Sequence, residues 1–186
     1  MTQVIFDKES HTYTLGGQKL PSVTEIISNS SLIDKKWFTA YASTRGTYVH
    51  EACALLDNGK LAEDYLDDVL EPFVEAYKKF KRLEMFDWDE IEVPCVNEKM
   101  GFAGTPDRVQ LSKIPVILDI KTGVKMPWHG IQLAGYALLK NMPFTKRYSL
   151  YLKNTGKFAL VEYRDSRDVD NFTIALNAYK KEKLNE

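Results

Sequence analysis

Residues 104–123 read GTPDRVQLSKIPVILDIKTG, a strongly apolar stretch interrupted by the charged side chains of Asp107, Asp119 and Lys121. Isolated charge is costly to bury, so these side chains need a reason to be there. Successive side chains of a strand point to opposite faces, and Asp119 and Lys121 therefore share one face, while Leu118 and Ile120 point the other way into the core. The stretch predicts two neighbouring strands, at 101–112 and 114–121, with a charged site on one face.

This pair of strands also predicts a metal site. If the first strand brings Asp107 beside Asp119, the two carboxylates repel each other unless a cation lies between them, and hard oxygen ligands favour Mg²⁺ or Mn²⁺. Lys121 next to such a metal can stabilise negative charge on an attacked phosphate or help to deprotonate water. A simpler alternative remains open, in which Asp119 and Lys121 form an ion pair on an edge strand and Asp107 caps a turn after Pro106.

The composition and net charge predict the number of domains and the way in which the protein can bind a polyanion. The 186 residues are 44% hydrophobic and 12% aromatic, which predicts one domain, 1–186, with one sizeable core. Because the formal net charge is only -1, a protein that binds a polyanion must concentrate its Lys and Arg locally and use metal ions to offset its acidic residues.

The cysteines and the apolar runs indicate in which compartment of the cell the protein is expected. Cys53 and Cys95 lie far apart without a C-x-x-C spacing, which argues against an iron-sulfur cluster and a zinc ribbon and favours a reducing cytoplasm, bacterial or phage-infected. Met1 is followed by no apolar leader, and no apolar run is long enough to span a bilayer, so we expect no membrane partner.

Residue periodicity predicts the elements around the charged stretch. They are a hairpin over 2–20 that turns at Gly16 and Gly17, a short helix after the cap candidates Ser22 and Thr24, helices over 37–56, from Pro72 and over 128–140, strands at 89–97, 145–152 and 157–163, and a closing amphipathic helix through Val169, Phe172, Leu176 and Tyr179. This order predicts an α/β sandwich with a mixed central sheet flanked by helices.

Four motifs occur in a meaningful order: RGTYVHEA at 45–52, GFAGTPDRV at 101–109, VILDIKTG at 116–123 and QLAGY at 132–136. Together, over 45–136, they resemble motifs I to IV of the PD-(D/E)xK nuclease superfamily in its RecB-like branch. The segment HTYTLGGQKLPSVTEI at 11–26 is similar to the N-terminal leader of phage-encoded RecB-like exonucleases and of the mitochondrial genome maintenance exonuclease. The resemblance implies a restriction-endonuclease-like core.

The resemblance also implies roles for individual residues. It makes His50, Asp107, Asp119 and the backbone carbonyl of Ile120 the ligands of Mg²⁺ or Mn²⁺, and Lys121 the catalytic lysine. Taken alone, a histidine on such a helix is more often a satisfied core residue. Glu51 either orients His50 or faces solvent, and Glu92 is either a further acidic member of the site or an exposed strand residue.

Further candidates concern the nucleic acid. Gln132 and Tyr136 share a helix face, and the resemblance places them beside the lysine and the DNA strand. Arg45 is a candidate phosphate clamp, and Ser22 and Thr24 are candidates to offer hydroxyls and helix-start amides to a phosphate. The aromatic side chains are expected either to stack on unpaired bases or to belong to the core, and they are Trp37, Phe38, Tyr41 and Trp128.

The expected function is a divalent-metal-dependent DNA exonuclease that acts on single-stranded DNA or DNA ends in phage or bacterial replication or recombination, with a replication or recombination protein as a partner candidate. Two enzymatic alternatives are a duplex-end recombination exonuclease and a structure-specific endonuclease. An alternative of another class is a catalytically silent module that binds DNA or a protein partner.

Overall fold

A five-stranded mixed sheet organises the chain. The computed structural model describes residues 4–30, 40–84 and 86–185, so the predicted contacts of Trp37 and Phe38, and of the Tyr41 side chain, lie outside the described residues. The strand order is β10-β9-β8-β7-β4. These strands comprise β4 (Glu90–Ile91), β7 (Arg108–Gln110), β8 (Val116–Lys121), β9 (Lys146–Leu152) and β10 (Phe158–Glu162). β8 and β9 run parallel and the other pairs antiparallel, which confirms the predicted mixed sheet.

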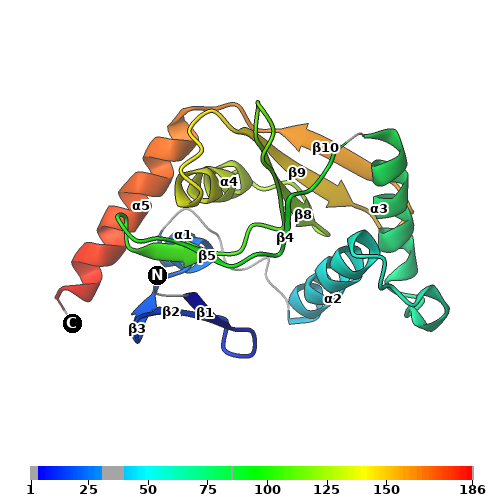
Figure 1. Cartoon of the computed structure of the whole chain (residues 1–186), viewed down its shortest axis with the longest axis horizontal. Coiled ribbons are helices and arrows are strands. Elements are labelled where there is room, and N and C mark those ends of the chain that lie inside the picture. Colours follow the sequence, from blue (N-terminus) through cyan, green and yellow to red (C-terminus); the bar gives the residue numbers. More distant parts are fainter. Residues whose placement is uncertain (1–3, 31–39, 85, 186) are drawn as a thin grey trace.

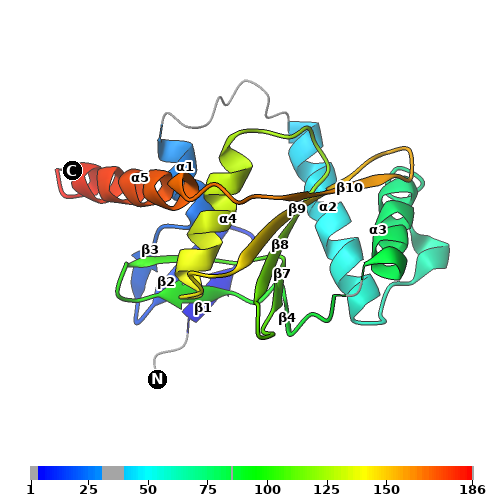
Figure 2. The same cartoon turned by 90° about the horizontal axis from the view of Figure 1, so that it is seen from above.

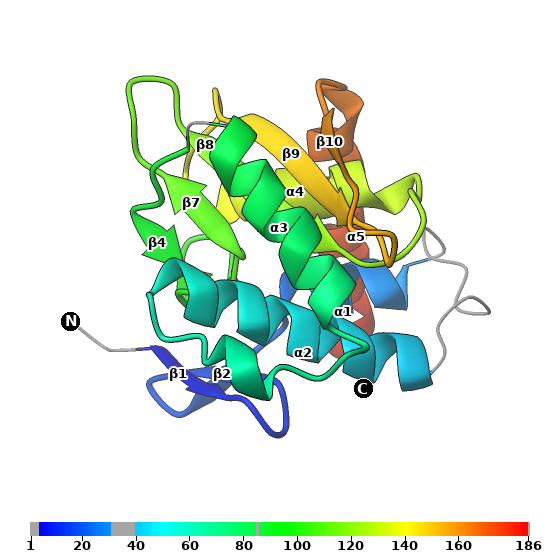
Figure 3. The ribbon, with the colours of Figure 1, turned by 90° about the vertical axis from the view of Figure 1, so that its right-hand side faces the viewer.

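Helices cover both faces of this sheet. On one face lie α1 (Val23–Asn29), α4 (Trp128–Leu139) and α5 (Arg167–Lys183), and on the other lie α2 (Ala40–Asp57) and α3 (Glu71–Leu83), as Figures 1 and 2 show. Figure 3 looks onto the side of α2 and α3, with the strands behind them. A short 3-10 turn, η2 (Glu63–Tyr65), precedes α3. The predicted helices from Pro72 and over 128–140 are confirmed.

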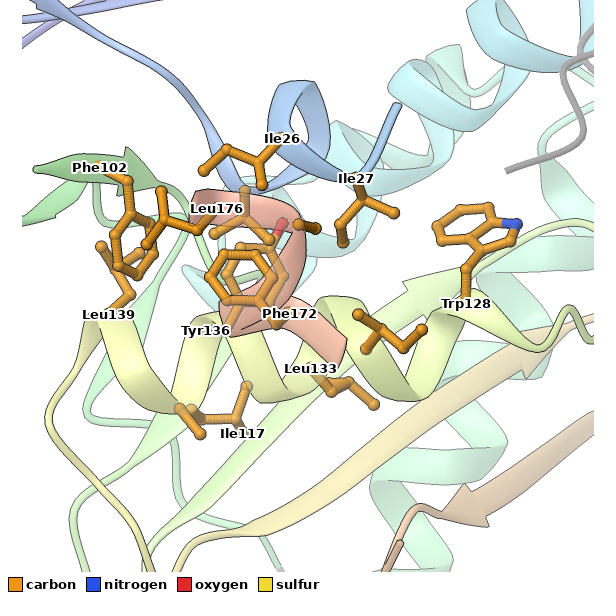
Figure 4. Packing of buried hydrophobic residues seen from close by; sticks show 14 of the residues in the cluster. Ile26, Ile27, Phe102, Ile117, Trp128, Leu133, Tyr136, Leu139, Phe172 and Leu176 are labelled. Atoms are coloured by element: carbon orange, nitrogen blue, oxygen red, sulfur yellow. The ribbon is translucent and has the colours of Figure 1, made fainter. Parts of the chain in front are cut away.

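Strand β8 divides the core. Its Ile117 packs in the cluster formed with α1, α4 and α5, where Phe172 and Leu133 meet (Figure 4). Its Leu118 and Ile120 pack in the second cluster, with residues of α2 and α3. The alternation predicted for this strand is therefore observed, and it is the reason why one six-residue segment anchors both layers.

The N-terminal region differs from the predicted hairpin. It forms a three-stranded sheet of β1 (Val4–Asp7), β2 (Thr12–Leu15) and β3 (Gln18–Leu20). Gly16 and Gly17 make the predicted turn, with φ angles of 57° and 84° that glycine adopts without strain. The additional turn is closed by Asp7, whose carboxylate accepts hydrogen bonds from the Glu9 and Ser10 backbone N–H groups. It lacks glycine and proline, which explains why the sequence pattern missed it.

The strands predicted at 89–97 and 101–112 are both broken, which corrects the prediction. Their outer halves, β4 and β7, stay in the main sheet, while β5 (Cys95–Asn97) and β6 (Phe102–Gly104) form a separate two-stranded sheet. Pro94 and Pro106 lie in the two breaks and have no N–H group to donate to a ladder. Glu92 adopts a left-handed backbone with φ of 52°. The break leaves Asp107 immediately before β7.

Helix α4 connects the parallel strands β8 and β9 and is buried along almost its whole length. Gly135 allows its close approach to neighbouring helices, because a Cβ atom there would lie 2.6 Å from Phe172 Cε2 of α5 and 2.9 Å from Val23 Cγ1 of α1. Among the described residues, no helix is both long and apolar enough to cross a membrane.

We expect Gly135→Ala to lower the free energy of unfolding by about 1–3 kcal/mol, because the added methyl group overpacks the junction of three helices. Elsewhere in a helix the same change stabilises. Urea denaturation measures the difference, with Gly123→Ala as the matched control, because a Cβ atom at Gly123 meets nothing within 4 Å. Equal unfolding free energies for the two variants would contradict the packing argument.

Candidate metal centre

Three potential metal ligands converge at the edge between α2 and the sheet. His50 Nδ1 lies 3.3 Å from Asp107 Oδ1 and 3.9 Å from Glu92 Oε1. One ligand atom from each residue falls within 4.8 Å of the others. Since His50 comes from α2, Glu92 from the break after β4 and Asp107 from the start of β7, the tertiary fold alone brings them together. Glu92 therefore lies in the candidate cluster, half-buried and just after β4, so the alternative of an exposed strand residue is wrong.

Asp107 is held in place from the sheet. Its side chain is 7% exposed, and its Oδ2 accepts a hydrogen bond from the Ile120 backbone N–H at 2.6 Å. Its other oxygen, Oδ1, is the one directed at His50. One oxygen thus anchors the carboxylate to β8, and the other is presented to the cluster.

The charges of this cluster suit a divalent cation. Burial opposes ionisation of Asp107, but the neighbouring His50 and the Ile120 N–H outweigh it and hold the pKa of Asp107 below its usual value. Burial opposes the His50 imidazolium too, but Asp107 more than offsets this and raises the pKa of His50 to about 9. Burial, followed by the charge of Asp107, raises the pKa of Glu92 to about 8. Protons thus neutralise the cluster, and the donor set of one imidazole and two carboxylates fits Mn²⁺ or Mg²⁺ in their place.

Lys121 forms a second group beside this cluster. Its Nζ lies 2.7 Å from Asp119 Oδ2 and donates a hydrogen bond to Gln132 Oε1 at 2.7 Å. Gln132 in turn donates from Nε2 to the Tyr136 hydroxyl at 3.2 Å, and Lys121 Nζ lies 5.3 Å from the centre of the Trp128 ring. The Lys121 side chain is therefore held by two contacts, one with Asp119 of its own strand and one with Gln132 of α4.

The simpler alternative, an ion pair of Asp119 and Lys121 on an edge strand, is confirmed in part. The ion pair of Asp119 and Lys121 is present, but β8 is an inner strand of the sheet, so the predicted edge position is wrong. The Asp119 side chain is 3% exposed, and burial raises its pKa to about 6 although Lys121 acts in the opposite direction. Asp119 lies outside the three-residue cluster and faces the lysine instead.

Other predicted residues are placed as follows. Glu51 is exposed, which favours the solvent-facing alternative for its side chain. The Ser22 hydroxyl is the cap of α1: it accepts from the Glu25 N–H at 3.0 Å and pairs with the Thr24 hydroxyl at 3.1 Å. Trp128 is buried, at 9% exposure, so its ring is part of the core cluster rather than an open platform. Contacts of Ser22, Thr24 and Trp128 with DNA stay predictions.

The sequence reading missed Arg108. Its side chain is fully buried on the side of α2 and α3, where its Nε donates to Asp57 Oδ2 at 2.6 Å and to the Tyr77 hydroxyl at 3.2 Å. Its Nη1 donates to the Asp107 backbone carbonyl at 2.6 Å and lies 3.5 Å from Glu92 Oε1. Arg108 therefore supports two members of the metal cluster from behind. The available signal was an arginine inside an apolar strand, directly after a candidate ligand.

A buried histidine lies behind Lys121. His129 Nδ1 accepts from the Met126 N–H at 3.4 Å and lies 2.6 Å from the Tyr151 hydroxyl, which is 2.7 Å from the Tyr163 hydroxyl. Burial lowers the pKa of His129 to about 3, and the positive charge of Lys121 acts in the same direction. The imidazole is therefore neutral in the folded protein.

Comparison with known proteins adds little to this geometry. No family model matches the sequence, and no curated protein matches it. A solved structure described as the crystal structure of SSO0001 aligns with 84% of this chain and 84% of its own, at 13% sequence identity and a TM-score of 0.37.

We expect Mn²⁺ to raise the thermal midpoint of unfolding, because an ion that binds only the folded state stabilises it, by about 2.7 kcal/mol at 100 times the Kd. His50→Gln removes a ligand and should abolish most of the rise in differential scanning fluorimetry. Glu51→Gln, on the same helix but exposed, is the matched control and should keep the rise. An equal response of both variants would contradict the proposed ligand set.

We expect Arg108→Met to lower the free energy of unfolding by about 3–5 kcal/mol, because it leaves Asp57 buried beside fewer compensating partners. Urea denaturation at neutral pH measures the loss. The exposed Arg82, changed to Met, is the control and should cost less than about 0.5 kcal/mol. A loss of the same size in both variants would show that the Arg108 network contributes nothing.

We also expect acid to destabilise the fold through His129. Below a pH of about 6.5 the unfolded histidine takes up a proton that the folded one, with its pKa lowered to about 3, does not bind. Its contribution is therefore complete above 6.5 and is lost as the pH falls, by about 2 kcal/mol at pH 5. His50, Glu92 and Asp119 act in the opposite direction, because their raised pKa values let the folded protein bind protons more readily than the unfolded chain does. Urea denaturation at pH 7 and pH 5 therefore compares the change in unfolding free energy of the wild type with that of His129→Gln, and the difference should favour the variant by about 2 kcal/mol. The same change in wild type and variant would contradict it.

Proposed function

We propose that this protein is a divalent-metal-dependent nuclease of the PD-(D/E)xK type, RecB-like branch, with a restriction-endonuclease-like core, and that it hydrolyses phosphodiester bonds in DNA. The observation that carries the proposal is the meeting of two groups at the end of β8. His50, Glu92 and Asp107 lie within ligand distance of one cation, and the Lys121 ammonium lies beside them, held by Gln132. All but Glu92 belong to the four sequence motifs.

Mg²⁺ or Mn²⁺, when bound, would act as a Lewis acid toward a phosphoryl oxygen. His50, Glu92 and Asp107 are the residues that would hold it, with Asp119 and the Ile120 carbonyl as further candidate ligands. Asp107 is positioned for this by the Ile120 N–H, and Glu92 by its contact with Arg108. The side chains of His50 and Glu92 are 28% and 33% exposed, so a substrate has access to them from solvent.

Lys121 supplies a fixed positive charge. Its ammonium is directed by Asp119 and Gln132, each at 2.7 Å, and needs little reorganisation as negative charge develops on the phosphate oxygens. Gln132 is itself oriented by Tyr136. The polar chain from Tyr136 through Gln132 to Lys121 thus positions the group that stabilises the transition state.

Within this class we favour an exonuclease that acts on single-stranded DNA or DNA ends in phage or bacterial replication or recombination. The N-terminal segment at 11–26, similar to the leader of phage-encoded RecB-like exonucleases, supports that choice over a duplex-end enzyme or a structure-specific endonuclease. A replication or recombination protein is the corresponding partner.

The test uses end-labelled oligonucleotides, single-stranded or annealed, with Mg²⁺, Mn²⁺ or EDTA. We expect metal-dependent cleavage by the wild type and a loss of about 100-fold or more in Lys121→Ala, because an electrostatic group of the transition state is removed. The position of the label identifies the direction of digestion, and annealing identifies the strand preference.

Lys113→Ala is the matched control, because it removes an exposed lysine at the opposite end of β8 and should cleave like the wild type. If the wild type is inert on every substrate with either metal but still shifts DNA in a gel, the protein is a catalytically silent binding module and the proposal is wrong.

A further inference from the structure

A pocket of about 570 Å³ opens at the carboxyl ends of the parallel strands β8 and β9. Its walls come from α2, the start of α3, the loop between β8 and α4, the turn between β9 and β10, and β10 itself. The volume lies in the range of small-molecule sites, and the ends of parallel strands are where open α/β sheets bind ligands.

The lining combines cations with an apolar floor. Arg45, Lys125 and Lys153 contribute positive charge, and none of the described residues that line the pocket is acidic. Ala159 and Val161 of β10 are half-buried and supply the apolar floor, while Phe73 and Tyr151 lie behind it at 2% and 5% exposure. In a chain whose net charge is -1, this is a local concentration of cations of the kind that a polyanion ligand requires.

The pocket begins one residue beyond Lys121, the lysine beside the candidate metal centre. Thr122, one of its lining residues, directly follows Lys121, and Tyr151 is paired in register with Lys121 across β8 and β9. Arg45 donates from Nη2 to the Thr122 carbonyl at 3.3 Å, which ties helix α2, the helix of His50, to the pocket rim. The opening is therefore within reach of a strand whose phosphate contacts Lys121.

We propose that this pocket binds one nucleotide unit of the substrate strand, adjacent to the phosphate that is cleaved. The phosphate of this unit is held by Lys125 and Lys153, and its base lies against the apolar floor of Ala159 and Val161, a contact that any of the four bases can make. The inference rests on the proposed nuclease function, and it adds the path that the substrate strand takes over the surface. The same nucleotide chemistry is offered by a strand and by a released mononucleotide.

Binding is measured by fluorescence anisotropy of a short labelled oligothymidylate in EDTA, so that no cleavage takes part. We expect the double variant Lys125→Ala and Lys153→Ala to bind about 10-fold more weakly, and the slope of log K against log salt to fall by about 0.7, because the neutralisation of one phosphate is lost. The matched control is Lys99→Ala with Lys113→Ala, which removes two exposed lysines outside the pocket. Equal affinity and slope in both double variants would overturn the assignment.

A second arm tests the floor and the source of the nucleotide. Ala159→Phe places a ring in the pocket and should weaken binding of the same oligonucleotide about 10-fold while the thermal midpoint stays near that of the wild type. Competition by thymidine 5′-monophosphate that depends on both lysines assigns the pocket to a terminal or released nucleotide. Absence of competition, with the oligonucleotide effect intact, assigns it to a nucleotide within the strand.

The two proposals fail separately. Lysine-dependent binding in EDTA without cleavage in Mg²⁺ or Mn²⁺ rejects the nuclease and leaves a strand-binding pocket. Metal-dependent cleavage that requires Lys121, with unchanged binding in the pocket variants, keeps the nuclease and rejects the pocket as the path of the strand.

Discussion

The hydrogen bond from the Ile120 N–H to the Asp107 carboxylate joins the fold to the site. Strand β7 begins only at Arg108, which pairs with Leu118 of β8. The Ile120 N–H, further along β8, therefore has no carbonyl of β7 to bond to. A buried N–H without a partner is costly, and the Asp107 side chain takes the place of the missing carbonyl at 2.6 Å. The break that interrupts the sheet is thus what converts a strand residue into a presented ligand.

The same break creates the need for Arg108. Asp107 and Arg108 are consecutive, and while the Asp107 side chain faces His50 in the metal cluster, the Arg108 side chain reaches Asp57 of α2 and Tyr77 of α3. A buried ion pair stabilises a fold little more than apolar side chains of the same size would. The Arg108 network is therefore better explained by the residues that it holds in place than by a gain in folding free energy. Arg108 donates a hydrogen bond to the Asp107 backbone carbonyl and contacts the Glu92 carboxylate, so it holds two residues of the metal cluster in place.

The sequence predicted what depends on local periodicity. The alternation of β8, the helix opened by Pro72 and the turn at Gly16 and Gly17 are confirmed, because each follows from residues that are close in the chain. The breaks at Pro94 and Pro106 were missed although both prolines were visible, because β propensity on either side favoured continuous strands. The contacts of Arg108 were missed, and the sequence left two alternatives open for Glu92, since both depend on how α2 packs against the sheet. The burial that separates Asp119 from the cluster and directs it to Lys121 is equally a tertiary effect.

Acidic and basic side chains occupy neighbouring parts of the sheet. The carboxylates of Glu92 and Asp107 lie after β4 and before β7, that of Asp119 pairs with Lys121 on β8, and the cations of the pocket lie past the end of β8. In the nuclease proposed above, the strand is held mainly by the cations of the pocket, which attract a polyanion without a metal. Only the phosphate beside Lys121 meets the carboxylates, where a divalent cation in place of the protons on His50 and Glu92 would supply the positive charge for cleavage. Binding and chemistry are thus assigned, in this proposal, to neighbouring but different residues.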